Sequence, residues 1–123
     1  MAKPEIEFTP TSSVPFRPCD PPIDGLSEAV LARNGTDGTI TRILRFEPGT
    51  DTSPIGTLTH DFWEEVYIFE GSFVDLRLGR TFRTGDWATR PPGMEHGPWF
   101  SPDGAKMFEV RYTQPAADGG DRR

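Results

Sequence analysis

Short runs of β-branched and aromatic residues recur along the middle of the chain, and turn-forming residues separate them. Successive side chains of a strand point to opposite faces, so the alternating run 72–78 is typical of a half-buried strand. Residues 26–33 fit either a short strand or two helical turns, and the hairpin signals Asn34-Gly35 and Asp37-Gly38 that follow favour the strand. The same pattern predicts further strands at residues 39–46, 66–70, 80–83, 87–90 and 107–112.

Turn signals at intervals of about 8–12 residues are typical of a sandwich or a barrel of short strands. The 13 glycines and 13 prolines make up about a fifth of the 123 residues, a share that also occurs in disordered chains. Aromatic residues stand at 11%, however, and disordered chains are poor in them. The chain is therefore predicted to be all-β.

Six prolines fall within the first 22 residues. Proline lacks a backbone N–H and disrupts helices, so this segment cannot form a regular helix. We expect residues 1–24 to form an extended, proline-rich N-terminal arm, either an edge strand or a strap over the domain. The compact domain is then expected at residues 25–114, followed by a polar tail at 115–123 that frays.

Acidic residues outnumber basic ones by 19 to 13, which gives a formal net charge of −6. This balance argues against binding to nucleic acid or to an anionic membrane, since both require a basic patch. The apolar runs are far shorter than the about 18 residues of a membrane-spanning helix, and residues 1–10 do not resemble a leader, so the expected location is cytoplasmic. Cys19, the single cysteine, can form neither an intramolecular disulfide nor a thiolate zinc cage, and we expect a structural or incidental role for it.

The chain contains two histidines, His60 and His96. A lone histidine is most often a surface or core residue, but His60 lies four positions before Glu64 at a predicted strand entry, and His96 follows a turn. Two imidazoles and one carboxylate are the ligand set of the facial triad that holds non-haem Fe(II) and leaves coordination positions open. Zinc also accepts two histidines and a glutamate with a water as the fourth ligand. The spacing alone does not show that the three residues meet in space.

Two stretches of the chain resemble the paired motifs of the cupin superfamily. Gly85 is followed after five residues by the run PPGMEH, which ends at His96 and matches the second cupin motif, G-x5-P-x-G-x2-H. The spacing from His60 through Glu64 to Gly71 matches the latter part of the first motif. Across residues 25–112 the chain is similar to the ChrR-type cupin of zinc-containing anti-sigma factors, and to small cupin dioxygenases of the acetylacetone and dihydroxyacetophenone kind.

The resemblance implies a single jelly-roll β-barrel with one divalent metal ion held inside it by His60, Glu64 and His96. Fe(II) or Zn is the expected metal, with Mn and Ni as alternatives. The first histidine of the first motif falls on Leu58, which cannot bind a metal. Its loss either opens a coordination position for substrate or dioxygen, or marks a barrel that binds its ligand without a metal. The retained pair of motifs favours metal binding.

Aromatic and charged residues near the proposed ligands are candidates for a substrate pocket. Aromatic side chains often line such pockets, although each of these could equally pack in the core or at the rim. On the last predicted strand, Glu109 and Arg111 alternate with Phe108, Val110 and Tyr112. The two charged residues line the barrel if these apolar residues face outward. They are surface charges if those residues face inward, which is the orientation we expect. The candidates are Phe62, Trp63, Trp99, Phe100, Arg42, Glu109 and Arg111.

The expected function is that of a small metal-dependent enzyme that acts on a small oxygen-containing organic molecule, with dioxygenase-type oxidation as the specific prediction. A metal centre can polarise a bound enolate or activate dioxygen beside it. A metal-assisted isomerase, cyclase or lyase is the closest alternative, and a non-enzymatic ligand- or metal-sensing module is another. A twofold mate would cover the strand edges of a short sandwich with an extended arm, so we expect a homodimer.

Overall fold

The computed structural model describes residues 2–114, and within them the chain forms strands and two 3₁₀ turns without an α-helix. The tail predicted at 115–123 lies outside the described residues. None of the described helical segments is long and apolar enough to cross a membrane. In chain order the elements are η1 (Thr11–Ser13), β1 (Arg17–Pro18), β2 (Leu26–Arg33), β3 (Ile40–Phe46), β4 (Thr50–Asp51), η2 (Ser53–Ile55), β5 (Trp63–Asp75), β6 (Arg80–Arg83), β7 (Trp87–Arg90), β8 (Trp99–Ser101) and β9 (Ala105–Tyr112).

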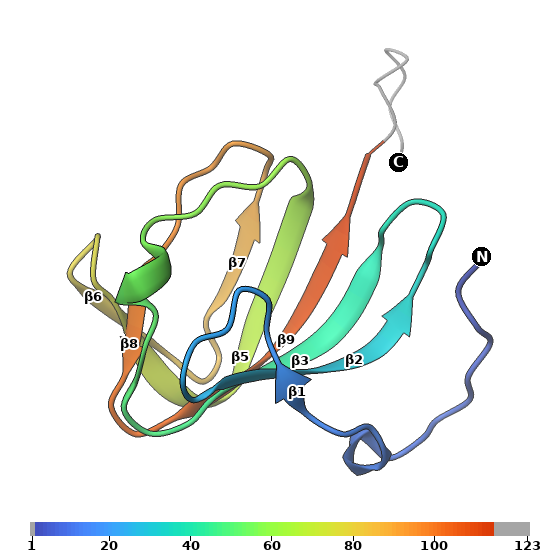
Figure 1. The fold of residues 1–123 in the computed structure, drawn as a ribbon, viewed down its shortest axis with the longest axis horizontal. Helices are drawn as coiled ribbons and strands as arrows, with labels where there is room; N and C mark the ends of the chain where they lie inside the picture. The colour runs from blue at the N-terminus through green and yellow to red at the C-terminus, as the bar shows by residue number, and fades with distance from the viewer. Residues whose placement is uncertain (1, 115–123) are drawn as a thin grey trace.

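The nine strands of the described residues form one antiparallel sheet that curls around an interior (Figure 1). The strand order along the sheet is β1-β2-β3-β9-β5-β8-β4, and β6 and β7 also pair with β5. β5 is the central strand, since its first half pairs with β7 and its second half with β6 and β8, while β9 runs beside much of it. The prediction of an all-β fold is confirmed.

The two predicted runs at 66–70 and 72–78 join into the single strand β5. At Gly71 the strand takes a φ of 76°, just beyond a register shift between Ile68 and Glu70. A side chain at position 71 would also collide with the carbonyl oxygen of Gly104. Glycine meets both requirements, because it has no Cβ and adopts positive φ without strain. Gly71 therefore lets β5 bend, so that one strand contributes side chains to both ends of the interior.

The shortest strands have no alternating pattern that a sequence could reveal. β1, β4 and β8 are two or three residues long. β4 and β8 were not predicted, whereas an edge strand was one of the two expected forms of the arm that carries β1. β1 lies in the proline-rich arm, where Arg17 pairs with Glu28 and Pro18 with Ser27 on β2. The arm thus joins the sheet at its edge, which is where proline is tolerated because its missing N–H costs no ladder hydrogen bond.

The apolar core lies inside the curl, toward the end where β5 meets β8. Phe46 of β3 and Phe73 of β5 pack edge to face with ring centroids 5.6 Å apart, and Trp99 of β8 stacks on Phe73 at 5.7 Å. Cys19 reaches this core from the arm, and burial raises the pKa of its thiol to about 11. The thiol is therefore uncharged at neutral pH, in keeping with a structural role for the cysteine.

Candidate metal centre and cavity

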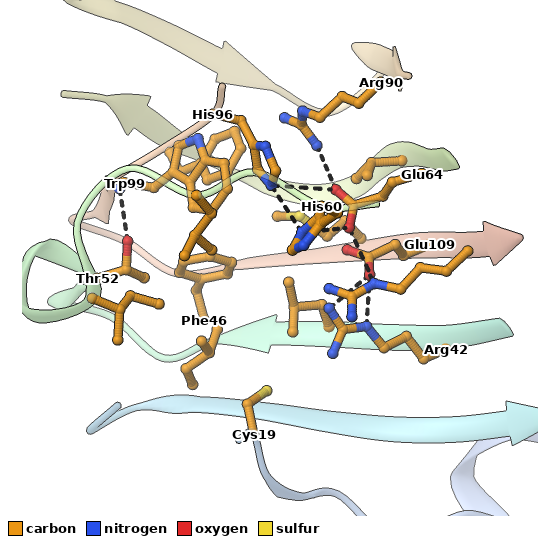
Figure 2. A pocket seen from close by; sticks show the side chains of 18 of the residues that line it. Cys19, Arg42, Phe46, Thr52, His60, Glu64, Arg90, His96, Trp99 and Glu109 are labelled. Carbon is orange, nitrogen blue, oxygen red and sulfur yellow. Dashed lines mark hydrogen bonds and ion pairs between the residues drawn. The ribbon is translucent and has the colours of Figure 1, made fainter. Parts of the chain in front are cut away.

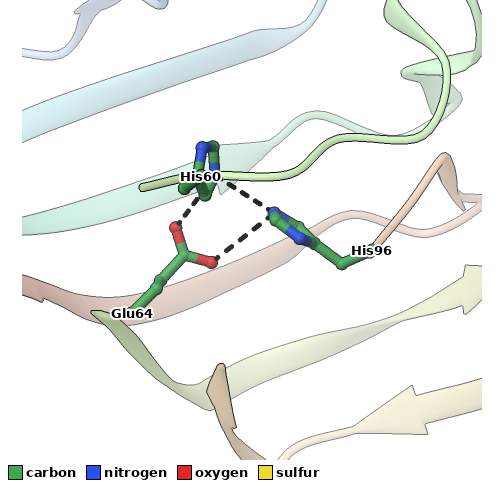
Figure 3. A group of neighbouring side chains, drawn as sticks. All are labelled: His60, Glu64 and His96. Carbon is green, nitrogen blue, oxygen red and sulfur yellow. Dashed lines mark hydrogen bonds and ion pairs between the residues drawn. The ribbon is translucent and has the colours of Figure 1, made fainter. Parts of the chain in front are cut away.

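His60, Glu64 and His96 come together at one point inside the sheet (Figure 3). His60 lies in the segment that leads into β5, Glu64 is the second residue of β5, and His96 lies between β7 and β8. The Nε2 atoms of His60 and His96 are 3.1 Å apart. Glu64 places Oε2 at 3.7 Å from Nε2 of His60 and Oε1 at 3.9 Å from Nε2 of His96. Three side chains from separate parts of the chain thus face a common centre.

Local structure explains why these side chains point inward. Along β5 the side chains alternate, so that Glu64, Val66 and Ile68 are buried while Glu65 and Tyr67 are exposed. The segment that carries His96 is fixed by two backbone hydrogen bonds, in which Leu58 N–H donates to the His96 carbonyl at 2.8 Å and His96 N–H donates back to the Leu58 carbonyl at 3.0 Å. The two loops that precede β5 and β8 are therefore held side by side.

The protonation of the two imidazoles suits metal binding. The Nδ1 atom of His96 lies 3.1 Å from the carbonyl oxygen of Met94, which can only accept, so Nδ1 carries the proton and Nε2 presents a lone pair. Burial lowers the pKa of His96. Burial and the nearby Arg111 guanidinium lower the pKa of His60 to about 4. Both rings are therefore neutral at pH 7, which is the form that binds metals.

The distances provide a test of whether one ion fits between these residues. Two nitrogen atoms bound at about 2.0–2.1 Å to a single tetrahedral or octahedral ion lie about 2.9–3.4 Å apart. The observed separation of 3.1 Å between the two Nε2 atoms falls in this range. The carboxylate is slightly farther away, and its oxygens also accept hydrogen bonds from Arg90 at 2.9 Å and Arg111 at 3.1 Å. The two-histidine, one-carboxylate set therefore fits a divalent cation.

Glu64 belongs to a chain of ion pairs that crosses the inner face of the sheet, which we call the ion-pair row. Its links measure 2.6 Å from Glu28 to Arg42, 2.6 Å from Arg42 to Glu109 and 2.8 Å from Glu109 to Arg111. Arg42 and Glu109 are directly opposite each other on β3 and β9, and Glu64 is directly opposite both Arg111 on β9 and Arg90 on β7. In order, the members are Glu28, Arg42, Glu109, Arg111, Glu64 and Arg90.

A cavity of about 170 Å³ lies beside the histidines and has one charged end and one aromatic end (Figure 2). At one end it is bordered by Arg42, Glu64, Arg90 and Glu109, and at the other end by aromatic side chains that include Phe46 and Trp99. Leu58, at the position of the missing histidine, also borders it. The cavity is thus polar beside the histidines and apolar farther in.

The three charged candidates for the substrate pocket all lie at the wall of the cavity. Arg42, Glu109 and Arg111 all border the cavity, so the expectation that Glu109 and Arg111 are surface charges is wrong. Phe108, which alternates with them, points outward and is 40% exposed, whereas Glu109 is only 3% exposed. The charges face inward because each has an opposite charge directly across the sheet, which offsets the cost of removing it from water.

Of the aromatic candidates for the substrate pocket, one borders the cavity and the others do not. Trp99 borders the cavity, and its indole N–H is buried without a hydrogen-bond partner among residues 2–114. Phe62 does not border it, but stacks on His60 with ring centroids 4.4 Å apart. Trp63 stacks on Tyr112 instead, and Phe100 alternates with Trp99 along β8, so neither of them borders the cavity.

Two residues that hold the site were missed from the sequence. Arg90 donates to Glu64, and the hydroxyl oxygen of the buried Thr52 accepts a hydrogen bond of 2.8 Å from the backbone N–H of Trp99. Arg90 lies on a predicted strand, but only the pairing of β7 with β5 places it opposite Glu64. Thr52 gives no sequence signal, since threonine is common in loops.

A curled antiparallel sheet that encloses two histidines and a glutamate in a cavity defines a protein of the cupin type. The family model of the ChrR cupin-like domain matches residues 5–114, and the chain belongs to this family. No curated protein matches the sequence.

Solved structures show the same fold at low sequence identity. An RmlC-like cupin from Shewanella frigidimarina matches with a TM-score of 0.69 and 21% identity, over 94% of this chain and 97% of that chain. A putative acetylacetone dioxygenase from Methylibium petroleiphilum matches with a TM-score of 0.69 and 15% identity, over 100% and 90% of the two chains. The Rhodobacter sphaeroides complex of SigE with the anti-sigma ChrR matches with a TM-score of 0.60 and 21% identity, over 79% of this chain and 49% of that chain.

Proposed function

We propose that this protein binds one divalent metal ion through His60, Glu64 and His96 and catalyses the dioxygenase-type oxidation of a small oxygen-containing organic molecule. The observation that carries the proposal is the 3.1 Å approach of two neutral imidazole nitrogens beside a buried carboxylate, at the wall of a cavity. Fe(II) or Zn is the expected metal, with Mn and Ni as alternatives, because this ligand set suits each of them.

The metal, when bound, would supply a Lewis-acid centre with open coordination positions. The chain supplies the rest of the site. Apolar side chains such as Leu58, Val66 and Phe73 border the cavity and restrict water, while Arg90 and Arg111 hold both oxygens of Glu64. A cavity of about 150 Å³ is known to hold benzene, so the volume of about 170 Å³ favours a substrate of similar size.

The test of the metal centre is the metal content of the purified protein beside two variants. His96→Ala removes a ligand and is expected to lose the metal. Leu58→His restores the motif histidine at a position that borders the cavity and lies opposite His96, and is expected to retain the metal more tightly. Unchanged metal content in both variants would contradict the assignment.

The test of the reaction is oxygen uptake after anaerobic loading with Fe(II). β-Diketones and hydroxylated aryl ketones are the first substrates to offer, because their neighbouring oxygens can chelate a metal. Uptake that depends on substrate and disappears in His96→Ala would support a dioxygenase. Metal binding without oxygen uptake in the presence of these compounds would contradict a dioxygenase that acts on them.

One observation favours the second candidate, a metal-assisted isomerase, cyclase or lyase. Arg90 and Arg111 place two cations within 3.1 Å of the Glu64 carboxylate and therefore close to any oxyanion that forms beside it. Such cations stabilise an enolate without any need for dioxygen. Turnover of a carbonyl substrate under argon would identify this reaction, and ligand binding without turnover in either gas would indicate a sensing module.

We also propose that the protein is a homodimer, on the basis of its outer face. Phe108, Tyr67 and Trp87 are directly paired across β9, β5 and β7, and therefore form one outer aromatic row. Phe108, Tyr67 and Trp87 are 40%, 47% and 69% exposed. Neighbouring exposed aromatics of this kind are typical of an interface, and a second copy with the same row would cover them.

Sedimentation equilibrium tests the dimer. The wild type is expected at twice the chain mass of 13.7 kDa, and Tyr67→Ser combined with Trp87→Ser is expected to sediment as a monomer. A wild-type protein that sediments as a single chain would contradict the proposal.

A further inference from the structure

The ion-pair row, most of which borders the cavity, is electrically balanced only when no metal is bound. The ion-pair row contains three glutamates and three arginines, each linked to its neighbour, so it is neutral as a whole. The two histidines add no charge of their own, because a histidine binds a metal ion as the neutral ring. A divalent cation among them therefore leaves an excess of two positive charges in a partly buried site. Buried charge is costly unless an opposite charge compensates it.

Two arginines of the row have hydrogen-bonding capacity to spare. Arg42 is fully engaged, since Nε and both terminal nitrogens contact Glu109 or Glu28. Arg90 uses one nitrogen on Glu64, and Arg111 uses only Nε, which it shares between Glu64 and Glu109. Within residues 2–114 the remaining guanidinium nitrogens of Arg90 and Arg111 have no hydrogen-bond partner, and both residues border the cavity.

The remaining walls limit what a compensating ligand can be. Apart from these charges, the cavity is bordered largely by apolar side chains, and its volume of about 170 Å³ admits only a short molecule. Asp20 also borders the cavity, but it is exposed to solvent, where water screens its charge. The site therefore suits a compact ligand with one anionic end and one apolar end.

We infer that the substrate or ligand of this cavity is a small carboxylate, whose anionic group binds between the free guanidinium nitrogens of Arg90 and Arg111 while its apolar end faces Phe46 and Trp99. This inference rests on the proposed metal centre, since the metal creates the positive excess. The guanidinium plane is matched to carboxylate geometry, and hydrogen bonds between two charged groups are stronger than neutral ones.

The inference can be tested with two probes of nearly equal shape. Pyruvate and 2,3-butanedione have the same number of non-hydrogen atoms and both carry adjacent oxygens, but only pyruvate is charged. Titration calorimetry on the Zn-loaded wild-type protein is expected to give at least about tenfold tighter binding of pyruvate. Zn is used because it has no redox chemistry of its own. This comparison needs no variant and is not affected by folding defects.

Variants separate the arginines from the metal, which alone could favour the anion. Arg90→Gln and Arg111→Gln are each expected to reduce the preference for pyruvate about tenfold. Arg83→Gln is the matched control, because Arg83 is exposed on β6 and does not border the cavity. Metal-free protein is expected to bind neither probe measurably.

The outcomes distinguish this inference from the proposed metal centre. If the protein binds Zn but holds pyruvate and butanedione equally, or keeps its full preference in both arginine variants, the carboxylate site is refuted and the metal centre stands. If wild-type protein does not bind Zn when titrated with the metal alone, the metal centre fails, and the carboxylate inference fails with it.

Discussion

The two ends of the interior are built from the same strands but in opposite ways. At one end, β3, β5 and β9 contribute Arg42, Glu64 and Glu109, which form a row of charges (Figure 2). At the other end, the same sheet contributes Phe46 and Phe73, which pack against Trp99. β5 alone carries both Glu64 and Phe73 on its inner face.

The two ends differ in how much they contribute to the stability of the fold. The aromatic end removes apolar surface from water, which is the main favourable contribution to folding. The charged end gains little, because the attraction between buried ions roughly offsets the cost of desolvating them. Under the proposed function, the row beside the two inward-facing histidines contributes to ligand binding more than to stability. Four perturbations test this comparison.

The largest expected loss of stability comes from the aromatic end. Phe46 is 2% exposed and packs edge to face on Phe73, so Phe46→Ala removes a buried ring and leaves a cavity. We expect the free energy of unfolding in urea to fall by about 3–5 kcal/mol. As a control, Phe8→Ala removes a ring that is fully exposed in the N-terminal arm and is expected to cost much less. Equal losses would contradict the assignment of the core.

At the charged end, the expected result depends on whether one partner or both are removed. Arg42→Met leaves Glu109 and Glu28 without their shared cation and is expected to cost about 3 kcal/mol. Combining it with Glu109→Leu removes the buried carboxylate that Arg42 no longer pairs and is expected to recover most of that loss. A double variant as unstable as the sum of the single ones would show that the row stabilises the fold after all.

Adjacent residues of β5 provide a matched test of the metal site. Glu64→Gln is expected to reduce the affinity for Zn by more than about 10–100-fold, the usual cost of losing an outer-shell partner, because it removes an anionic ligand. Glu65→Gln changes the next side chain, which points to the opposite face and accepts a hydrogen bond from Tyr112, and is expected to leave the affinity unchanged. Similar affinities in both variants would place the metal elsewhere.

The smallest effect concerns pH in the metal-free protein. Burial lowers the pKa of His60 from 6.5 to about 4, so between these values the unfolded chain binds a proton that the folded chain does not. Stability contributed by His60 is therefore complete above about pH 6.5 and is lost as the pH falls toward 4. Since water still reaches part of the ring, we expect about 1–2 kcal/mol. Urea titrations from pH 7 to 4 should show a shallower decline in His60→Gln than in wild type, and equal declines would exclude this contribution.

The alternation of apolar and polar residues was enough to predict most long strands. Residues 87–90 and 80–83 match β7 and β6, and 26–33 matches β2, because each is bounded by turn residues that cannot continue a strand. The scarcity of histidine and the resemblance to the paired cupin motifs pointed to His60, Glu64 and His96, which the structure brings together. Both the alternation and the motifs can be read from short stretches of sequence.

The pairing and register of the strands could not be predicted from the sequence in the same way. The sequence gives Glu109 and Arg111 an alternating pattern but not the face on which they lie, since alternation is the same for either choice. Only the register of β9 against β3 and β5 places Glu109 opposite Arg42 and Arg111 opposite Glu64. The apolar residues that alternate with them, such as Phe108, then face outward.

The chain by itself therefore determined where most of the longer strands lie and which side chains could hold a cation. The tertiary structure decided which charges meet inside the sheet, because ion pairing between strands depends on contacts among residues far apart in sequence. Arg90 is the clearest case: it lies within the second cupin motif at a position that the motif leaves unspecified, and it joins Glu64 only when β7 pairs with β5.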